Sequence, residues 1–113
     1  MLHKYGEFTD EQISQTKIKI RKSIFFILLC CDPTTNKKYV DVDVNKAFLD
    51  LLYKLGGMND ILFSPAELVT VISLLQSALN EYNSPTFDFD VCRKLLLDAG
   101  SEIMKVKEVF LVD

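Results

Sequence analysis

The stretch Ser23-Ile24-Phe25-Phe26-Ile27-Leu28-Leu29-Cys30-Cys31 contains eight consecutive apolar residues, and it closes a longer segment with helical spacing. A helix that is apolar on every side is not stable when water surrounds it. The core of the protein, a second copy of the chain or another protein must therefore cover this stretch. The neighbouring segments indicate how much of that cover the chain itself provides.

The first helix is predicted over 9–31. Thr9 and Gln12 match a capping box at its start, and the Asp32-Pro33 pair predicts its end because the residue before proline disfavours helical geometry. One face collects the apolar residues Ile13, Ile20, Ile24, Ile27 and Cys31. A second face carries Ile18, Phe25 and Leu29, so the helix begins amphipathic and ends almost wholly apolar.

The second helix is predicted over 43–55. Asp43 is its expected cap, and Gly56-Gly57 is its expected exit through a left-handed residue. The segment 39–44 alternates in the manner of a short strand, but we interpret it as an extended lead-in to this helix. The apolar positions with helical spacing are Val44, Phe48, Leu51, Leu52 and Leu55.

The third helix is predicted over 64–82, where Phe63-Ser64-Pro65-Ala66-Glu67-Leu68 combines a capping box, proline at the first helical position and a Phe63/Leu68 staple. Its apolar stripe consists of Leu68, Val71, Ile72, Leu75, Leu79 and Tyr82.

The fourth helix is predicted over 89–107, with its start at Asp88 or Asp90. Gly100 lies in its middle and indicates either a close helix crossing or a break. The residues expected to face the core are Val91, Leu95, Leu96, Ala99, Ile103, Val106 and Phe110. The segments 40–46 and 87–93 are similar at an offset of 47 residues, which raises the hypothesis of two pseudo-equivalent helix pairs.

These elements predict an all-α, four-helix bundle-like single domain spanning 1–113. The length of 113 residues suits one domain, and 49 % apolar with 26 % charged residues is a globular composition. The longest apolar run is too short to span a bilayer, and no signal peptide is recognisable. Three cysteines, two of them adjacent, favour a reducing compartment, so we expect a cytoplasmic protein with free thiols.

Charge is distributed unevenly along the chain. Between 12 and 31 there are four bases and no acid, whereas between 55 and 92 there are five acids and no base. Three interpretations are open: the first and third helices complement one another, both faces are simply solvated, or the acidic segment faces a basic partner and steers its approach. A nucleic-acid-binding helical regulator is the less favoured of two alternative functions. The net charge of −3 disfavours a general nucleic-acid binder, and the third helix has no Lys or Arg with which to read DNA as a helix-turn-helix would.

Catalytic and cofactor motifs are not recognisable. The single histidine, His3, lies near the terminus, and the glycines form no phosphate-binding loop, so we expect neither an enzyme nor a cofactor. The alternative is a degenerate EF-hand-like calcium site, because Asp32, Thr34, Asn36 and Asp43 fall at ligand positions of a twelve-residue frame. Against it, Lys37 occupies the glycine position, and capping of helix N-termini also accounts for the aspartates.

We therefore expect a non-enzymatic protein–protein interaction module, such as a regulator, adaptor, inhibitor or immunity-type protein. Its partner is another protein or a second copy of itself, a homodimer in the latter case. The leftover apolar side of the first helix and the charge-poor face of the third helix are the expected contact surfaces. The predicted partner-binding residues are Phe25, Leu29, Thr70, Ser73, Gln76, Ser77 and Asn80.

Overall fold

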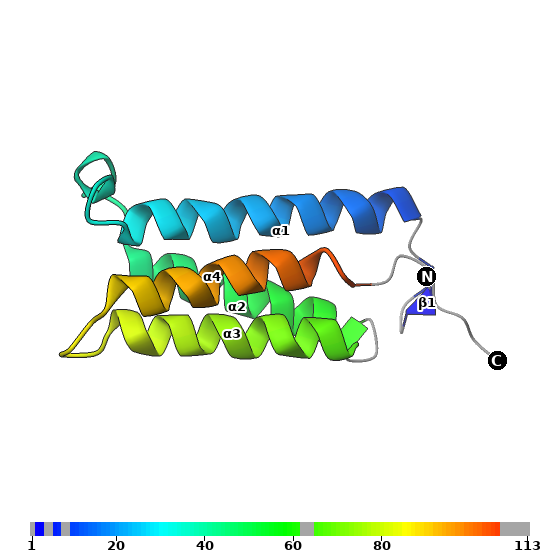
Figure 1. Cartoon of the computed structure of the whole chain (residues 1–113). Helices are drawn as coiled ribbons and strands as arrows, with labels where there is room; N and C mark the ends of the chain where they lie inside the picture. The colour runs from blue at the N-terminus through cyan, green and yellow to red at the C-terminus, as the bar shows by residue number, and fades with distance from the viewer. Residues whose placement is uncertain (1, 4–5, 8–9, 62–64, 107–113) are drawn as a thin grey trace.

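The computed structural model describes residues 2–3, 6–7, 10–61 and 65–106, and its helices form an all-α, bundle-like fold (Figure 1). The elements in chain order are β1 (Leu2–His3), β2 (Gly6–Glu7), α1 (Asp10–Cys31), the 3-10 helix η1 (Asn36–Tyr39), α2 (Val44–Ile61), α3 (Ala66–Tyr82) and α4 (Phe89–Ile103). The two strands form only a short antiparallel ladder, in which Leu2 pairs with Glu7.

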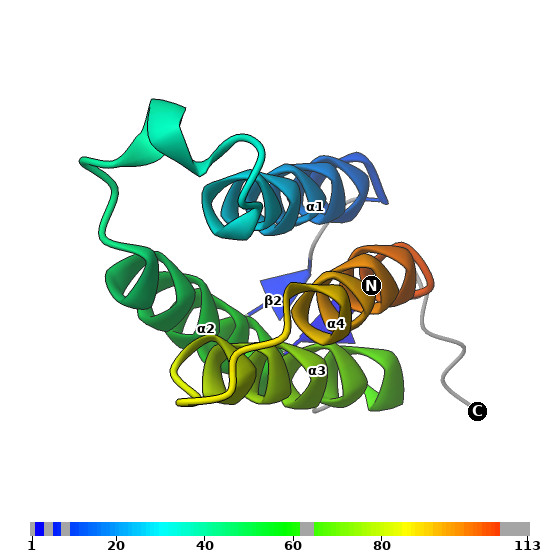
Figure 2. The same cartoon turned by 60° about the vertical axis from the view of Figure 1, so that its left-hand side comes forward.

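Successive helices run in opposite directions, and each packs beside the next in the chain (Figure 1). Because α4 also packs against α1, the four helices form a ring, which is visible along the bundle in Figure 2. The contact between α3 and α4 is the most extensive and that between α1 and α2 is the least extensive. The basic α1 and the acidic α3 lie diagonally, so direct packing does not pair their charges.

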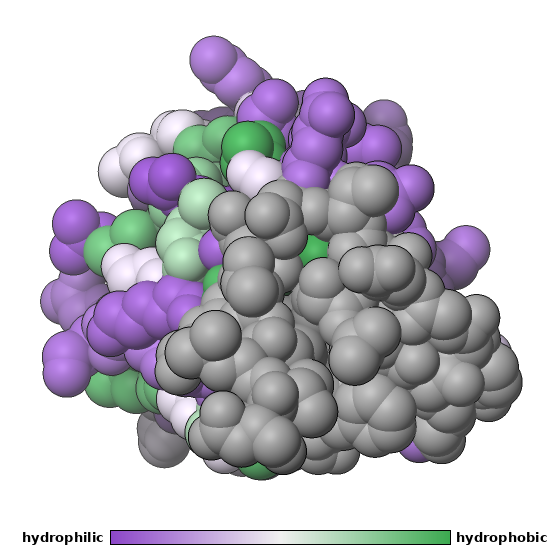
Figure 3. Space-filling view, turned by 90° about the vertical axis from the view of Figure 1, so that its right-hand side faces the viewer, coloured by the Kyte–Doolittle hydropathy of each residue, from purple (hydrophilic) through white to green (hydrophobic). Residues whose placement is uncertain are grey.

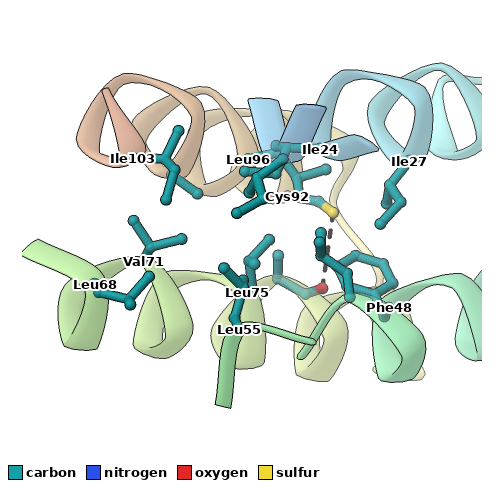
Figure 4. Close-up of a cluster of buried hydrophobic side chains, with 14 of the residues drawn as sticks. Ile24, Ile27, Phe48, Leu55, Leu68, Val71, Leu75, Cys92, Leu96 and Ile103 are labelled. Atoms are coloured by element: carbon teal, nitrogen blue, oxygen red, sulfur yellow. Dashed lines mark hydrogen bonds between the residues drawn. The ribbon is translucent and has the colours of Figure 1, made fainter. Parts of the chain in front are cut away.

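The apolar stripes predicted for the four helices meet in one core (Figure 4). The α1 face is confirmed, and residues on the other helices with no exposed surface include Phe48, Leu55, Leu68, Val71, Leu75, Leu96 and Ile103. Val91 is an exception, because it is 45 % exposed and Cys92 takes the inward position. Cys92, Leu96 and Ala99 recur at helical spacing and form the buried stripe. Val91 precedes Cys92 by one residue, so its side chain points about 100° away from that stripe.

The second helix does not end at Leu55. It continues through Gly56 and Gly57 to Ile61, so the predicted exit at this glycine pair is wrong. Each glycine costs about 1 kcal/mol of helix stability relative to alanine, which is too little to end a helix anchored on both sides. Leu55 is fully buried before the pair, and Met58 packs against the core directly after it.

The ends of the last two helices also differ from prediction. Pro65 has φ −60° and ψ 140°, so it precedes α3 and does not occupy the first helical position. Asp88 caps α4 by accepting a hydrogen bond from the Asp90 N–H at 2.9 Å. The helix ends at Ile103 and a turn follows, so the predicted extension to 107 is wrong. The expected features at Thr9, 63–64 and Phe110 lie outside the described residues.

The two helix pairs share only their general layout. A long segment containing η1 joins α1 to α2, whereas a short turn joins α3 to α4. Asp43 caps α2 and Asp88 caps α4, and the offset of 47 relates neither cap to the other. The similarity between the two halves therefore does not extend to equivalent capping roles.

Gly100 lies inside α4 and marks a close crossing with α1. A Cβ atom at Gly100 would lie 2.9 Å from Cε1 of Phe25, which is closer than side chains normally approach. The guanidinium of Arg21 lies 5.2 Å from the centre of the same ring. The choice left open by the sequence is thus resolved in favour of helix packing, and α4 is not broken.

Lys17 is the buried charged residue of α1, with only 4 % of its surface exposed. Its Nζ donates a hydrogen bond of 2.8 Å to the carbonyl of Val106, which follows the end of α4. This contact ties the first half of α1 to the last described residue of the chain.

Candidate functional site

The weak packing between α1 and α2 leaves a groove on that side of the bundle. It consists of two hollows of about 310 Å³ and 490 Å³, and both are lined by Ser23, Leu51 and Lys54. We call the two hollows together the α1–α2 groove. The lining side chains from α1 are Thr16, Lys19, Ile20, Lys22, Ser23, Phe26 and Ile27. Those from α2 are Ala47, Asp50, Leu51, Tyr53, Lys54 and Met58, and Gly57, which has no side chain, lines the groove with its backbone.

Apolar residues from the same stripes that build the core form the floor of the groove. Ile20 and Leu51 are at most 8 % exposed, and Met58 is half-buried. The floor is consequently continuous with the core, and a partner lying on it would extend the packing of the bundle.

Charged side chains line the rims of the groove, with three lysines against one aspartate. Lys19 and Lys22 come from α1 and Lys54 from α2, while Asp50 is the acidic lining residue. The three lysines make no ion pair with acidic residues in the part of the chain that the structure describes. The groove thus combines an apolar floor with a net positive rim.

Two aromatic side chains mark different parts of the groove. Phe26 is 41 % exposed, and its ring meets the ring of Tyr39 from η1 edge-on at 5.5 Å. Tyr53 is 86 % exposed on the rim formed by α2. Exposed aromatic residues beside an apolar hollow are typical of protein-binding sites.

The surface predicted on α1 is only partly available to a partner. Leu29 is 41 % exposed, as expected for the side of α1 that the other helices leave uncovered. Phe25 is half-buried because its ring packs against Gly100. Neither residue lines the α1–α2 groove, and their role in partner binding stays a prediction.

The five residues predicted on α3 lie on one exposed face. Thr70, Ser73, Gln76, Ser77 and Asn80 are all exposed. Thr70 uses its hydroxyl to donate to the Ala66 carbonyl at 3.0 Å within the same helix. The α1–α2 groove contains none of the predicted partner-binding residues of α1 or α3. The structure therefore does not join the predicted surfaces with the groove in one site.

The two aspartates of the calcium-like frame accept hydrogen bonds from backbone N–H groups. Asp32 accepts hydrogen bonds from the N–H and the hydroxyl of Thr34, and these bonds hold the pKa of its carboxyl below the usual value. Asp43 accepts from the Lys46 N–H at 3.1 Å. Within the described ranges, His, Cys, Asp and Glu residues do not gather in groups of three that could hold a metal ion.

The cysteines are buried and free. Cys92 donates from its thiol to the Ala78 carbonyl at 3.7 Å, shown by the dashed line in Figure 4. A hydrogen bond to Cys92, together with burial, raises the pKa of the Cys31 thiol, and burial raises the pKa of Cys30. The same hydrogen bond lowers the pKa of the Cys92 thiol, which has no exposed surface. A reactive cysteine needs an exposed thiolate, so this arrangement favours packing over chemistry.

Sequence reasoning missed both the groove and the burial of Lys17. Lys17 lies four residues after Ile13 and three before Ile20, so its place in the buried stripe was visible in the spacing. The groove had no comparable signal, because it depends on the separation of two helices whose apolar stripes were correctly predicted.

Seen from the end of the bundle where α1 begins, the surface outside the grey atoms is mixed, with hydrophobic residues between hydrophilic ones (Figure 3). The described helices include none with both the length and the apolar character needed to cross a bilayer. Comparisons with protein-family models, with curated protein sequences and with solved structures give no match.

Proposed function

We propose that this chain is a non-enzymatic protein–protein interaction module, a regulator, adaptor, inhibitor or immunity-type protein of the cytoplasm. The α1–α2 groove is the observation that carries the proposal. Its apolar floor is open to a partner, and its lysines have no acidic partner among the described residues. Contacts of this kind, in which an apolar centre is surrounded by a polar rim, are typical of protein interfaces.

The proposal is tested by capture of partners from a lysate of the native source, with the full chain as bait. The first variant is Lys19→Glu/Lys54→Glu, which reverses charge on both rims of the groove. The matched control is Lys38→Glu/Lys94→Glu, which makes the same change of net charge at two exposed lysines outside the groove. Both variants are first compared with the wild type by circular dichroism and by unfolding.

We expect a specific protein to be retained by the wild type and the control, and lost from the groove variant. Crosslinking through Tyr53, on the rim, should then join bait and partner. If the wild type retains nothing above a matrix without bait, the proposed function is wrong. If both variants retain the partner equally, the partner binds elsewhere, and the exposed face of α3 becomes the next surface to test.

A further inference from the structure

The dimensions of the α1–α2 groove suit a single helix. Its lining residues run from Thr16 to Ile27 on α1 and from Ala47 to Met58 on α2. At 1.5 Å per residue, each wall is about 16 to 18 Å long, which matches about three turns of a partner helix. Because α1 and α2 are antiparallel and make the least extensive contact in the ring, a helix lying along the groove would contact both of them.

Gly57 leaves room on the groove side of α2 for another backbone. It lies four residues before the end of α2, and a Cβ built there meets no atom within 4 Å. The fold therefore has no steric need for glycine at this position, although glycine weakens a helix relative to alanine. The missing side chain allows another backbone to approach α2 closely, as small residues do at helix crossings.

The rim selects the charge of the occupant. Lys19, Lys22 and Lys54 outnumber Asp50, so acidic residues flanking an apolar stripe complement the groove. The described helices of a second copy do not fit this requirement. The apolar stripe of α3 is already buried at Leu68 and Leu75, and the exposed sides of α1, α2 and α4 all carry bases. The occupant is accordingly a segment of another protein.

We propose that the α1–α2 groove binds an amphipathic helix of about three turns from another protein, with its apolar stripe on Ile20, Leu51 and Met58 and its acidic residues facing the three lysines. Gly57 allows the close approach of the two helices. This inference rests on the proposed function, since it names the class of partner segment that the same groove takes.

The test uses fluorescein-labelled model peptides of about 14 residues with a leucine stripe at helical spacing. One peptide carries glutamate beside the stripe, a second carries lysine at the same positions, and a third is a scramble of the first. Binding to the full chain is followed by fluorescence anisotropy at low and high salt. We expect the glutamate peptide to bind at least about tenfold more tightly than the others, with affinity that falls as salt rises.

Two adjacent substitutions locate the site. Gly57→Leu fills the groove, whereas Gly56→Leu adds the same side chain to the same helix outside the groove lining. We expect Gly57→Leu to weaken binding of the glutamate peptide by at least about tenfold and Gly56→Leu by less than about twofold. Circular dichroism and urea unfolding establish that both variants are folded. Should Gly57→Leu not fold, Lys54→Glu provides the same test through charge.

The inference is wrong if the glutamate and lysine peptides bind equally, or if folded Gly57→Leu binds as the wild type does. It is also wrong if sedimentation shows self-association that Gly57→Leu abolishes, because the groove then takes a second copy. A wild type that binds no peptide but still captures a partner through the groove refutes the helical occupant and leaves the proposed function standing. Failure of capture as well refutes the proposed function itself.

Discussion

Replacing Gly100 by alanine tests the close crossing of α1 and α4, because two effects of opposite sign meet at this position. Alanine raises helix propensity by about 1 kcal/mol relative to glycine. The new Cβ, however, would lie 2.9 Å from Cε1 and 3.3 Å from Cζ of Phe25. Overpacking of this kind costs about 1 to 3 kcal/mol. We therefore expect Gly100→Ala to lower the free energy of unfolding by up to about 2 kcal/mol.

The contribution of the Phe25 ring is isolated by a double-mutant cycle. In a Phe25→Ala background the clash is absent, so Gly100→Ala should instead stabilise the protein by about 1 kcal/mol. The expected coupling energy between the two positions is about 1 to 3 kcal/mol. Gly56→Ala serves as the reference for propensity alone, because that glycine is exposed in α2 and has open space around it.

The wild type, the two single variants, the double variant and the Gly56→Ala reference are compared by urea unfolding at equilibrium. The free energy of unfolding is extrapolated to water, and the dependence on urea concentration is checked for agreement among the variants. Equal stabilisation of the wild type by Gly100→Ala and by Gly56→Ala would refute the reasoning. That result would mean that the Phe25 ring moves aside at no measurable cost and does not constrain the crossing of α1 and α4.

Three further predictions concern the buried polar groups and a helix cap. Lys17→Met should lower the free energy of unfolding by about 1 to 3 kcal/mol, because the Val106 carbonyl loses the donor that lies 2.8 Å away. The control Lys94→Met, at an exposed site, should change it by less than about 0.5 kcal/mol. Equal effects of the two substitutions in urea unfolding would contradict the contact between Lys17 and Val106. Burial raises the pKa of the Cys30 thiol, so the folded chain keeps a proton that the unfolded chain loses. The stability from this thiol should be complete below its ordinary pKa of about 8.5 and should then decrease by up to about 1.4 kcal/mol per pH unit as the pH rises. Unfolding at a series of pH values should show a shallower decrease in Cys30→Ala, and parallel curves would contradict the assignment. Asp88→Ala removes the cap of α4 and should lower the free energy of unfolding by about 1 kcal/mol in the same urea assay. Asp98→Ala, at an exposed position inside α4, is the control. Equal stabilities of the two variants would show that the cap does not contribute.

The candidate site illustrates what a sequence pattern leaves undecided. The apolar spacing of α1 and α2 correctly places Ile20 and Leu51 on inward faces. This spacing does not specify the distance between α1 and α2, and the groove depends on that distance. The pair Gly56-Gly57 by itself predicts a helix end, because glycine commonly supplies the left-handed residue that follows a helix. Burial on both sides of the pair overrides this preference, and a predicted terminus becomes part of the groove.

The sequence by itself determined the fold class, the inward faces and several helix ends. A period of 3.6 residues decides which side chains share a face, and local chemistry such as the Asp32-Pro33 pair and the Asp43 cap acts within a few residues. Tertiary structure decided the continuation of α2, the packing of Phe25 on Gly100, the burial of Lys17 and the opening between α1 and α2. These features depend on contacts between residues far apart in the chain. A preference of about 1 kcal/mol at one residue is smaller than the packing of a whole helix face, so contacts between the helices determine the outcome.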